Sequence, residues 1–428
     1  MLQRLSQAGK DIRLVVIGTG SMGRGIVYQA EITPFIECVA IADRNIEKAI
    51  ACAEWIGRPY QIVYTKGEVY RAVEEGKLAV AVDGNLVAQY ELADALVESS
   101  TAVYEGARHA ITAMMHGLHT IMINAEADLT YGPRLLSIAK EQGLVYSSCD
   151  GDQPAAIKRL VDQIMFWGFD LVMAGNIKGY LDRYVNPTSI IPEADKRGLE
   201  YKMCTSFTDG TKLNIEMALV ANALNLRAAV PGMLGPRSTS ISQVFELFDF
   251  DTLWGADRCP LVDYVLGAQP KGGVFVIVHS DREYQQYTLD WFPVELGPGP
   301  YYLFYRPYHL RHIEAMNTVV DTVLNSHALL KPDYGHATNV FAYAREDLKK
   351  GTRLDGIGGY CCYGLIENAH DGNASPAGLP ICLSENVTLR RDVNKDERIA
   401  LQDAIYDSND PRYLLYAEAL AAGGKPMD

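Results

Sequence analysis

Short apolar runs alternate with amphipathic stretches through the first third of the chain. The run from Ile12 to Ile17 is almost continuously apolar and is followed by glycine, which is typical of a parallel strand buried on both faces. We expect further strands at 38–42, 78–82, 119–123 and 144–147, and helices at 107–115 and 134–142, with an earlier helix ending near residue 34. This alternation predicts an α/β fold: a doubly wound parallel sheet of the Rossmann type that ends near residue 150.

A glycine-rich turn, Gly18-Thr-Gly20-Ser-Met-Gly23, directly follows the first predicted strand. The first glycine permits a tight turn, the second lets the backbone approach a pyrophosphate, and the third lets the next helix pack against the strand. Asp43 ends the second strand 20 residues after Gly23, where a carboxylate accepts a ribose hydroxyl. The sequence therefore predicts a dinucleotide site, which we assign to Gly18, Thr19, Gly20, Ser21, Met22, Gly23, Asp43, Arg44, Asn124 and Glu126.

The residues at the end of the second strand leave the choice of nucleotide open. Asp43 favours NAD(H) because a carboxylate repels a 2′-phosphate, whereas Arg44 beside it could bind that phosphate or stack on the adenine. The segment from Asn124 to Asp128 follows a predicted strand, at the edge of the sheet where ligands bind. Glu126 and Asp128 are also an oxygen pair that a divalent cation could use, although we assign no metal ligand.

Three charged residues on the apolar face of a predicted helix are the strongest indication of a catalytic site. Asp209 is a plausible N-cap, and at 100° per residue Asp209, Lys212 and Glu216 fall within about 60° of one another on the apolar side. The opposite side carries Asn214, Asn222 and Asn225. Buried charges need partners and their pKa values shift usefully, so this pattern favours a catalytic cleft. The alternative is a solvated i, i+4 pair of Lys212 and Glu216.

A desolvated lysine near a carboxylate can move the proton of a carbonyl/alcohol pair during hydride transfer. We therefore assign Lys212, Asp209, Lys178 and Glu216 as catalytic candidates. Lys178 is expected in a glycine-flanked loop, where it binds substrate or shares the proton transfer; the alternative is an exposed loop lysine. Asp152, Arg306 and His309 are the candidate substrate-binding residues. The His309–His312 spacing lacks a third ligand nearby and predicts no metal site.

Composition narrows the function classes. The 428 residues favour two or three domains, and 39 Lys and Arg against 53 Asp and Glu give a net charge of −14, which argues against nucleic acid as a partner. The eight cysteines contain no C-x-x-C pair, so neither a zinc cage nor a disulfide framework is indicated. Because the sequence shows no signal peptide and no apolar run of about 20 residues, we expect a soluble, cytoplasmic protein without a membrane partner.

The motifs together resemble a known family. The glycine-rich turn, the Asn124–Asp128 turn, the Tyr146–Pro154 segment, the Asp209–Glu216 helix and the Arg306–Leu310 segment resemble homoserine-dehydrogenase-like proteins with a C-terminal SAF domain. That group includes deoxyxylulose-phosphate reductoisomerase-like enzymes and apionate oxidoisomerases. The tail segments 354–360, 378–383 and 389–393 look like the SAF module of sialic acid synthases and antifreeze proteins, so the resemblance covers nearly the whole chain.

The resemblance implies an NAD(P)-dependent oxidoreductase that acts on CH–OH groups of a small polyhydroxylated substrate, in some members with a skeletal rearrangement. It favours NADP(H) over NAD(H), and we expect a homo-oligomer. We expect a dinucleotide-binding domain at 1–150, an α+β substrate domain at 151–335, with helix 309–326 packing back on the first, and a small β-rich SAF-like module at 336–428. The alternatives are a homoserine dehydrogenase and a non-catalytic protein that senses the nucleotide.

Overall fold

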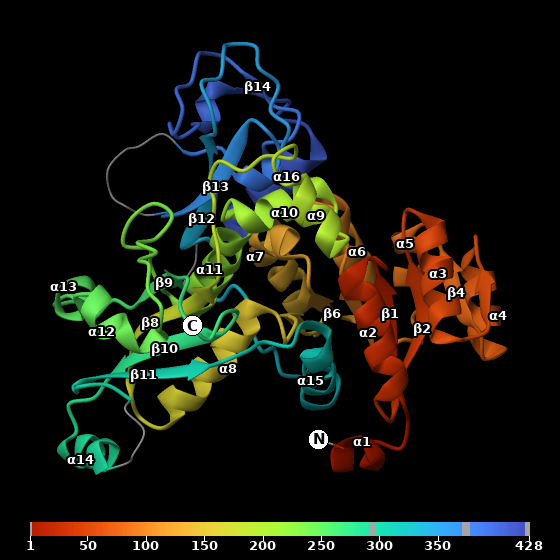
Figure 1. The fold of residues 1–428 in the computed structure, drawn as a ribbon. Coiled ribbons are helices and arrows are strands. Elements are labelled where there is room, and N and C mark those ends of the chain that lie inside the picture. The colour runs from red at the N-terminus through yellow and green to blue at the C-terminus, as the bar shows by residue number, and fades with distance from the viewer. Residues whose placement is uncertain (1, 292–295, 370–376, 424–428) are drawn as a thin grey trace. The chain divides into compact units, whose positions relative to one another are not determined.

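The computed structural model describes residues 2–291, 296–369 and 377–423. The chain divides into two compact units (Figure 1). The described residues of unit 1 lie within 2–155, Leu310–Pro332 and Glu418–Gly423, and those of unit 2 lie within Ala156–His309 and Asp333–Ala417. Among the described residues, no helix is both long enough and apolar enough to cross a membrane.

Unit 1 is built on a seven-stranded parallel sheet with the strand order β3-β4-β2-β1-β5-β6-β7. The predicted α/β fold with a doubly wound sheet is thereby confirmed. Two strands, β3 and β5, were not predicted, because they are short and their apolar residues lie within longer mixed segments. The strands are β1 Ile12–Ile17, β2 Ile36–Ala42, β3 Tyr60–Ile62, β4 Leu78–Ala81, β5 Ala95–Glu98, β6 His119–Met122 and β7 Tyr146–Ser148.

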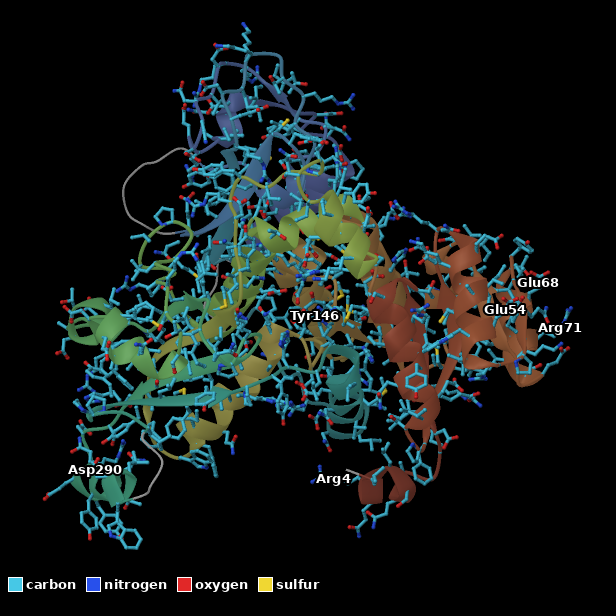
Figure 2. All side chains as sticks on the ribbon, in the orientation of Figure 1. Arg4, Glu54, Glu68, Arg71, Tyr146 and Asp290 are labelled. Carbon is cyan, nitrogen blue, oxygen red and sulfur yellow. The ribbon has the colours of Figure 1, made fainter. Side chains whose placement is uncertain are left out.

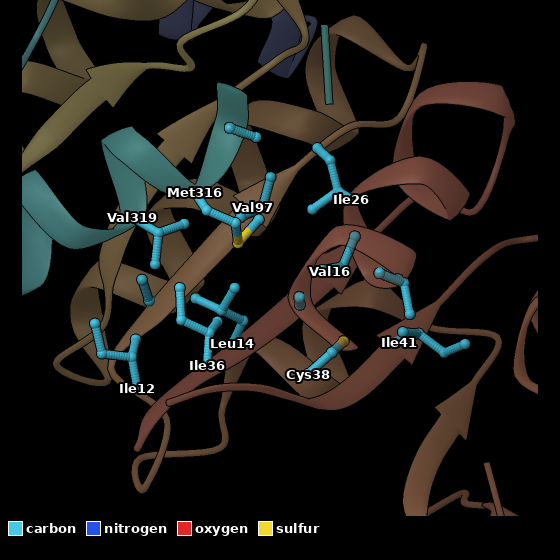
Figure 3. Close-up of a cluster of buried hydrophobic side chains, with 14 of the residues drawn as sticks. Ile12, Leu14, Val16, Ile26, Ile36, Cys38, Ile41, Val97, Met316 and Val319 are labelled. Atoms are coloured by element: carbon cyan, nitrogen blue, oxygen red, sulfur yellow. The ribbon is translucent and has the colours of Figure 1, made fainter. Parts of the chain in front are cut away.

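Helices cover this sheet, and one of them comes from late in the chain. The helix α15 (Arg311–Asn325) buries Met316 and Val319 against residues of β1 such as Leu14 (Figure 3). The expected return of this helix to the first part of the chain is therefore confirmed. The other helices of unit 1 are α1 Leu2–Gln7, α2 Ser21–Ile32, α3 Ile46–Ile56, α4 Lys66–Glu74, α5 Gly84–Ala88, α6 Val103–Met115 and α7 Ala125–Glu141.

The helix α7 begins nine residues earlier than the predicted start at residue 134. Asn124 caps it by accepting a hydrogen bond from the backbone N–H of Ala127 at 3.0 Å. Pro133, one residue before the predicted start, lies inside the helix. The expected turn from Asn124 to Asp128 is consequently the cap and first turn of α7.

Unit 2 contains a four-stranded mixed sheet with the order β11-β10-β8-β9. The strands β8 (Asp170–Lys178) and β9 (Leu261–Leu266) are parallel, whereas β10 (Val274–His279) runs antiparallel to β8 and to β11 (Tyr301–Arg306). One face of the sheet packs a core that includes Phe275 and Ile277. The helices between residues 150 and 291 are α8 Gln153–Phe166, α9 Ile191–Arg197, α10 Tyr201–Thr208, α11 Thr211–Leu224, α12 Val244–Leu247, α13 Phe250–Trp254 and α14 Glu283–Trp291.

The C-terminal part of unit 2 is rich in short strands, as predicted. The strands β12 (Thr338–Ala344) and β13 (Cys362–Asn368) form an antiparallel pair, and β14 (Thr388–Leu389) pairs with β15 (Ala404–Ile405). Helix α16 (Pro411–Gly423) follows them. The helix α11 packs on β12 and β13, and its Thr211 and Asn214 side chains accept hydrogen bonds from the backbone of β13.

Candidate functional site

The glycine-rich turn sits at the carboxyl end of β1 in unit 1. Gly18 has φ +88°, and a Cβ there would lie 2.6 Å from the backbone N of Ser100. A Cβ on Gly23 would collide with the carbonyl oxygen of Gly18, so both positions require glycine. Nothing lies within 4 Å of the Cβ position of Gly20, which leaves the outer surface of the turn open. This geometry is what a close approach of a pyrophosphate requires.

The first turn of α2 offers backbone donors above this turn. Gly20 is the N-cap residue and has no side chain to accept from the first N–H groups; Ser21 is exposed and Met22 half-buried. Uncapped N–H groups at a helix N-terminus, together with the helix dipole, favour an anion. The first turn of α2 therefore leaves backbone donors beside the glycine-rich turn that an anion could use.

Asp43 is bound to the glycine-rich turn itself. Its carboxylate accepts hydrogen bonds from the backbone N of Thr19 at 2.9 Å and from Thr19 Oγ1 at 3.2 Å, and also from the backbone N of Asn45. Asp43 is half-buried and Arg44 is exposed. The carboxylate consequently positions the turn, while the guanidinium next to it lies at the surface.

Three residues at the end of β5 support the turn and were not recognised in the sequence. Ser99 Oγ donates to the carbonyl oxygens of Gly18 at 2.7 Å and Ile17 at 2.9 Å. The buried Glu98 accepts from the backbone N of Ser100 at 2.8 Å and contacts His109 Nδ1 at 2.8 Å. A polar pair of serines after a short apolar run was the only signal of this arrangement.

Asn124 and Asp128 have structural partners within unit 1. Besides capping α7, Asn124 donates from Nδ2 to the carbonyl of Ala102 at 2.9 Å. Asp128 is buried and accepts from Tyr146 Oη at 2.6 Å and from Ser148 Oγ at 2.5 Å (Tyr146 is labelled in Figure 2). Burial raises the pKa of Asp128 to about 6, against the lowering effect of these hydrogen bonds.

Of the suggested oxygen pair for a cation, Asp128 has both carboxylate oxygens in hydrogen bonds with hydroxyl donors. Glu126 lies half-buried in the first turn of α7. Within the ranges that the structure describes, no three His, Cys, Asp or Glu side chains form a group that could hold a metal ion.

Asp209 does not begin the helix that carries Lys212, contrary to our prediction. It is the C-cap residue of α10, and Gly210, with φ +91°, separates α10 from α11. The Asp209 carboxylate still accepts from the backbone N of Thr211 at 2.8 Å. Its side chain is fully buried and forms an ion pair at 2.7 Å with Arg345. Burial raises the pKa of this carboxyl, and Arg345 opposes that shift.

The helix α11 is buried on every side, so its predicted polar face is wrong. Twelve of its 14 residues are buried, including Glu216 and Asn222. Asn222 accepts from the backbone N of Thr338 at 2.8 Å and donates to its carbonyl at 3.1 Å. The asparagines face the C-terminal strands, which begin more than a hundred residues later. Lys212 is half-buried, one helical turn before Glu216.

The remaining candidates lie at one end of the unit 2 sheet, except Asp152. Lys178 is the last residue of β8, not a loop residue as expected, and Arg306 is the last residue of β11. His309 Nδ1 lies 3.0 Å from the carbonyl oxygen of Gly272, just before β10. Asp152 is half-buried and belongs to unit 1, directly before α8.

The seven-stranded sheet with its glycine-rich turn makes unit 1 a Rossmann-type α/β protein. Residues 151–315 match a family model described as "Oxidoreductase DRL, catalytic domain". The matched segment holds Lys178 and the Asp209–Glu216 region, and the match supports an oxidoreductase. No protein in a search of curated proteins matches the chain.

Several solved structures are similar to the chain. The chain is similar to biliverdin reductase from Synechocystis sp. PCC 6803, with 14% identity, a TM-score of 0.29 and coverage of 40% of this chain and 48% of that one. It is also similar to DOX-P reductoisomerase with fosmidomycin and magnesium, with 16% identity, a TM-score of 0.36 and coverage of 48% of this chain and 56% of that one. A probable dehydrogenase from Thermotoga maritima has 12% identity and a TM-score of 0.40, and the match covers 74% of this chain and 90% of that one. The chain thus spans about half the length of the first two structures.

Proposed function

We propose that the chain is an NAD(P)-dependent oxidoreductase acting on a small, polyhydroxylated, sugar-derived substrate. The observation that carries the proposal is the glycine-rich turn: Gly18 and Gly23 are sterically required, the surface of Gly20 is open, and the first turn of α2 is uncapped. The family match of residues 151–315 supports redox chemistry in unit 2. When bound, the nicotinamide would supply or accept the hydride.

For the nucleotide, we propose that Gly18, Gly20 and Gly23 hold the pyrophosphate and that NADP(H) is preferred. The support is that Asp43 already accepts two hydrogen bonds from Thr19, while Arg44 is exposed beside it. An exposed guanidinium is suited to a 2′-phosphate, which it can bind through two parallel hydrogen bonds.

For the proton transfer, we propose Lys212 as the group that protonates the carbonyl oxygen as its carbon gains hydride, or takes that proton in the reverse direction. Its partial burial and its position one turn from the buried Glu216 support this role. Asp209 is fully buried against Arg345, so we propose it as a positioning residue that fixes the start of α11. Lys178, Arg306 and His309 are proposed to contact the substrate.

The direct test follows the absorbance of reduced nicotinamide while the full chain is incubated with NAD(H) or NADP(H) and a panel of branched sugars, their acids and their phosphates. We expect turnover with at least one panel member, and the carbon skeleton of the product distinguishes simple oxidation or reduction from a rearrangement. Nucleotide binding without turnover on any panel member would contradict catalysis and favour a nucleotide-sensing protein.

The nucleotide preference has its own test. We expect Arg44→Ala to weaken the binding of NADPH about tenfold or more, the scale of losing a charge-assisted hydrogen bond, and to leave NADH binding nearly unchanged. Equal losses for both nucleotides would show that Arg44 does not read the 2′-phosphate.

A further inference from the structure

A polar strip crosses the otherwise apolar face of the unit 2 sheet. Asn176 of β8 is opposite Val274 of β10, and Val274 is opposite Arg306 of β11 on its other side. Residues opposite one another on neighbouring strands point to the same face, and so do residues two apart on one strand. Asn176, Lys178 and Arg306 therefore project from the same face at the same end of the sheet. Tyr264 of β9, opposite Asn176, extends the strip.

Asn176 differs from the other residues of this strip. Its side chain is fully buried, and neither Oδ1 nor Nδ2 has a hydrogen-bond partner among the residues that the structure describes. Two of its neighbours on this face, Ala174 and Val274, are apolar and fully buried. A buried amide that makes no hydrogen bond is costly, and a leucine of similar shape would avoid the cost. The amide is thus not explained by the packing of unit 2.

The pattern of unmade bonds specifies the chemistry of the missing partner. Oδ1 needs a hydrogen-bond donor and Nδ2 needs an acceptor. The donor and the acceptor must both lie at the outer edge of the planar Asn176 carboxamide. A carboxylate or phosphate only accepts, and an ammonium group only donates, so neither satisfies both atoms. A hydroxyl both donates and accepts. Two hydroxyls on adjacent carbons present one donor and one acceptor at the spacing of the two amide atoms.

We propose that Asn176 is a specificity-determining residue whose carboxamide binds two neighbouring hydroxyls of the substrate, an inference that rests on the function proposed above. Lys178 and Arg306 form the half-buried rim of this site on the same face. Because Asn176 is fully buried, the proposal requires these two side chains to move aside when the ligand enters. The substrate class is then a vicinal diol, and a deoxy analogue leaves one amide atom unpaired and binds weakly.

The first test compares two buried asparagines of unit 2. Asn176→Leu removes an amide without partners, so the thermal midpoint of the chain should stay the same or rise. Asn222→Leu removes the acceptor for the backbone N–H of Thr338 and should lower the midpoint. A fall for Asn176→Leu as large as that for Asn222→Leu would show that a buried water or another structural partner satisfies the amide, and would overturn the proposal.

The second test measures binding of two probes by ligand-detected NMR in the presence of NADPH: erythritol, which has adjacent hydroxyls, and 1,4-butanediol, which has none. The wild-type chain should bind erythritol about tenfold or more tightly than butanediol, and Asn176→Leu should bind both with similar weak affinity. A wild-type chain without this preference, or an Asn176→Leu variant that keeps it, would overturn the proposal. A chain that shows the preference but turns over no substrate contradicts the proposed enzyme activity and supports the hydroxyl site.

Discussion

Arg345 and Asp209 form a buried ion pair in unit 2, with Nη2 of the arginine 2.7 Å from Oδ2 of the aspartate. The same guanidinium donates to the carbonyl oxygens of Arg183 and Val185 and, at 2.9 Å, to that of Cys362. One side chain thereby joins β13, the segment before α9 and the start of α11. The orientation of the helix that carries Lys212 consequently depends on a residue that directly follows β12.

We expect Arg345→Met to destabilise unit 2 strongly. Removing one member of a buried pair leaves the other charge without compensation, which costs about 3–5 kcal/mol. The double variant with Asp209→Asn should recover part of this loss, as measured by urea unfolding in a double-mutant cycle. Lys349→Met, which breaks an ion pair with Asp392 in which both side chains are mostly exposed, is the control and should change the free energy of unfolding far less. If Arg345→Met lowered the free energy of unfolding no more than Lys349→Met does, the structural role of Arg345 would be contradicted.

Lys212→Ala should reduce turnover by about 10² or more, the usual scale for the loss of a general acid or base, and should leave nucleotide affinity unchanged. Lys212→Arg keeps the charge but cannot release its proton at neutral pH, so it should recover stability and not turnover. The control is Lys196→Ala, an exposed lysine on α9. Asn222 is unsuitable as a control, because it binds the backbone of Thr338. Wild-type turnover by Lys212→Ala would make α11 a purely structural helix.

The buried Asp128 should make unit 1 less stable as the pH rises. Its folded pKa, about 6, lies above the ordinary value of 3.8, so between these values the folded chain holds the proton more tightly than the unfolded chain. The stabilisation that the protonated Asp128 gives the folded state is complete below about pH 4 and is lost as the pH rises through about 6. At about 1.4 kcal/mol per pKa unit, the loss approaches roughly 3 kcal/mol.

Asp128→Asn removes this titration and can still accept from Tyr146. The thermal midpoint of the variant relative to wild type should therefore rise between pH 4 and pH 7. Parallel profiles for the two proteins across this range would show that Asp128 stays ionised in the folded chain.

Gly20→Ala should leave folding intact and weaken nucleotide binding at least tenfold. A Cβ at this position meets nothing in the folded chain but projects into the space that a pyrophosphate would need. Gly67→Ala is the matched control, since a Cβ on Gly67 in α4 also meets nothing, and it should leave NADPH fluorescence titrations unchanged. Gly23→Ala should instead prevent correct folding of the turn, because its Cβ collides with Gly18. Unchanged NADPH affinity in Gly20→Ala would place the nucleotide elsewhere.

Features whose partners are close in sequence could be predicted from the sequence. The strand from Ile12 to Ile17, the glycine-rich turn and Asp43 belong to one local β-α-β unit, and their geometry follows from residue type and spacing. Features whose partners are distant could not. Glu98 and Ser99 acquire their roles from Gly18 and His109, and only the folded sheet brings Ser99 to a turn 81 residues earlier.

The same reason explains the errors at α11. Helical periodicity predicted that Lys212 and Glu216 lie away from a solvated face, and Glu216 is buried while Lys212 is half-buried. Periodicity could not show that the opposite face is buried too. The strands that cover Asn214 and Asn222 are β12 (Thr338–Ala344) and β13 (Cys362–Asn368). A polar side chain that pairs with a distant backbone looks like a surface residue in sequence. Asn176 was overlooked because it is one polar residue inside a mostly apolar strand.

The place of α15 in the core of unit 1 has a consequence for the order in which the protein is made. Residues such as Met316 and Val319 belong to the same hydrophobic cluster as Leu14 of β1, so the hydrophobic core of unit 1 is incomplete until about residue 320 has been synthesised. A ribosome must therefore translate the sheet of unit 2 before α15 can complete the hydrophobic core of the seven-stranded sheet in unit 1. A fragment ending at residue 155 leaves Ile12 and Leu14 without their partners and should aggregate in the cell.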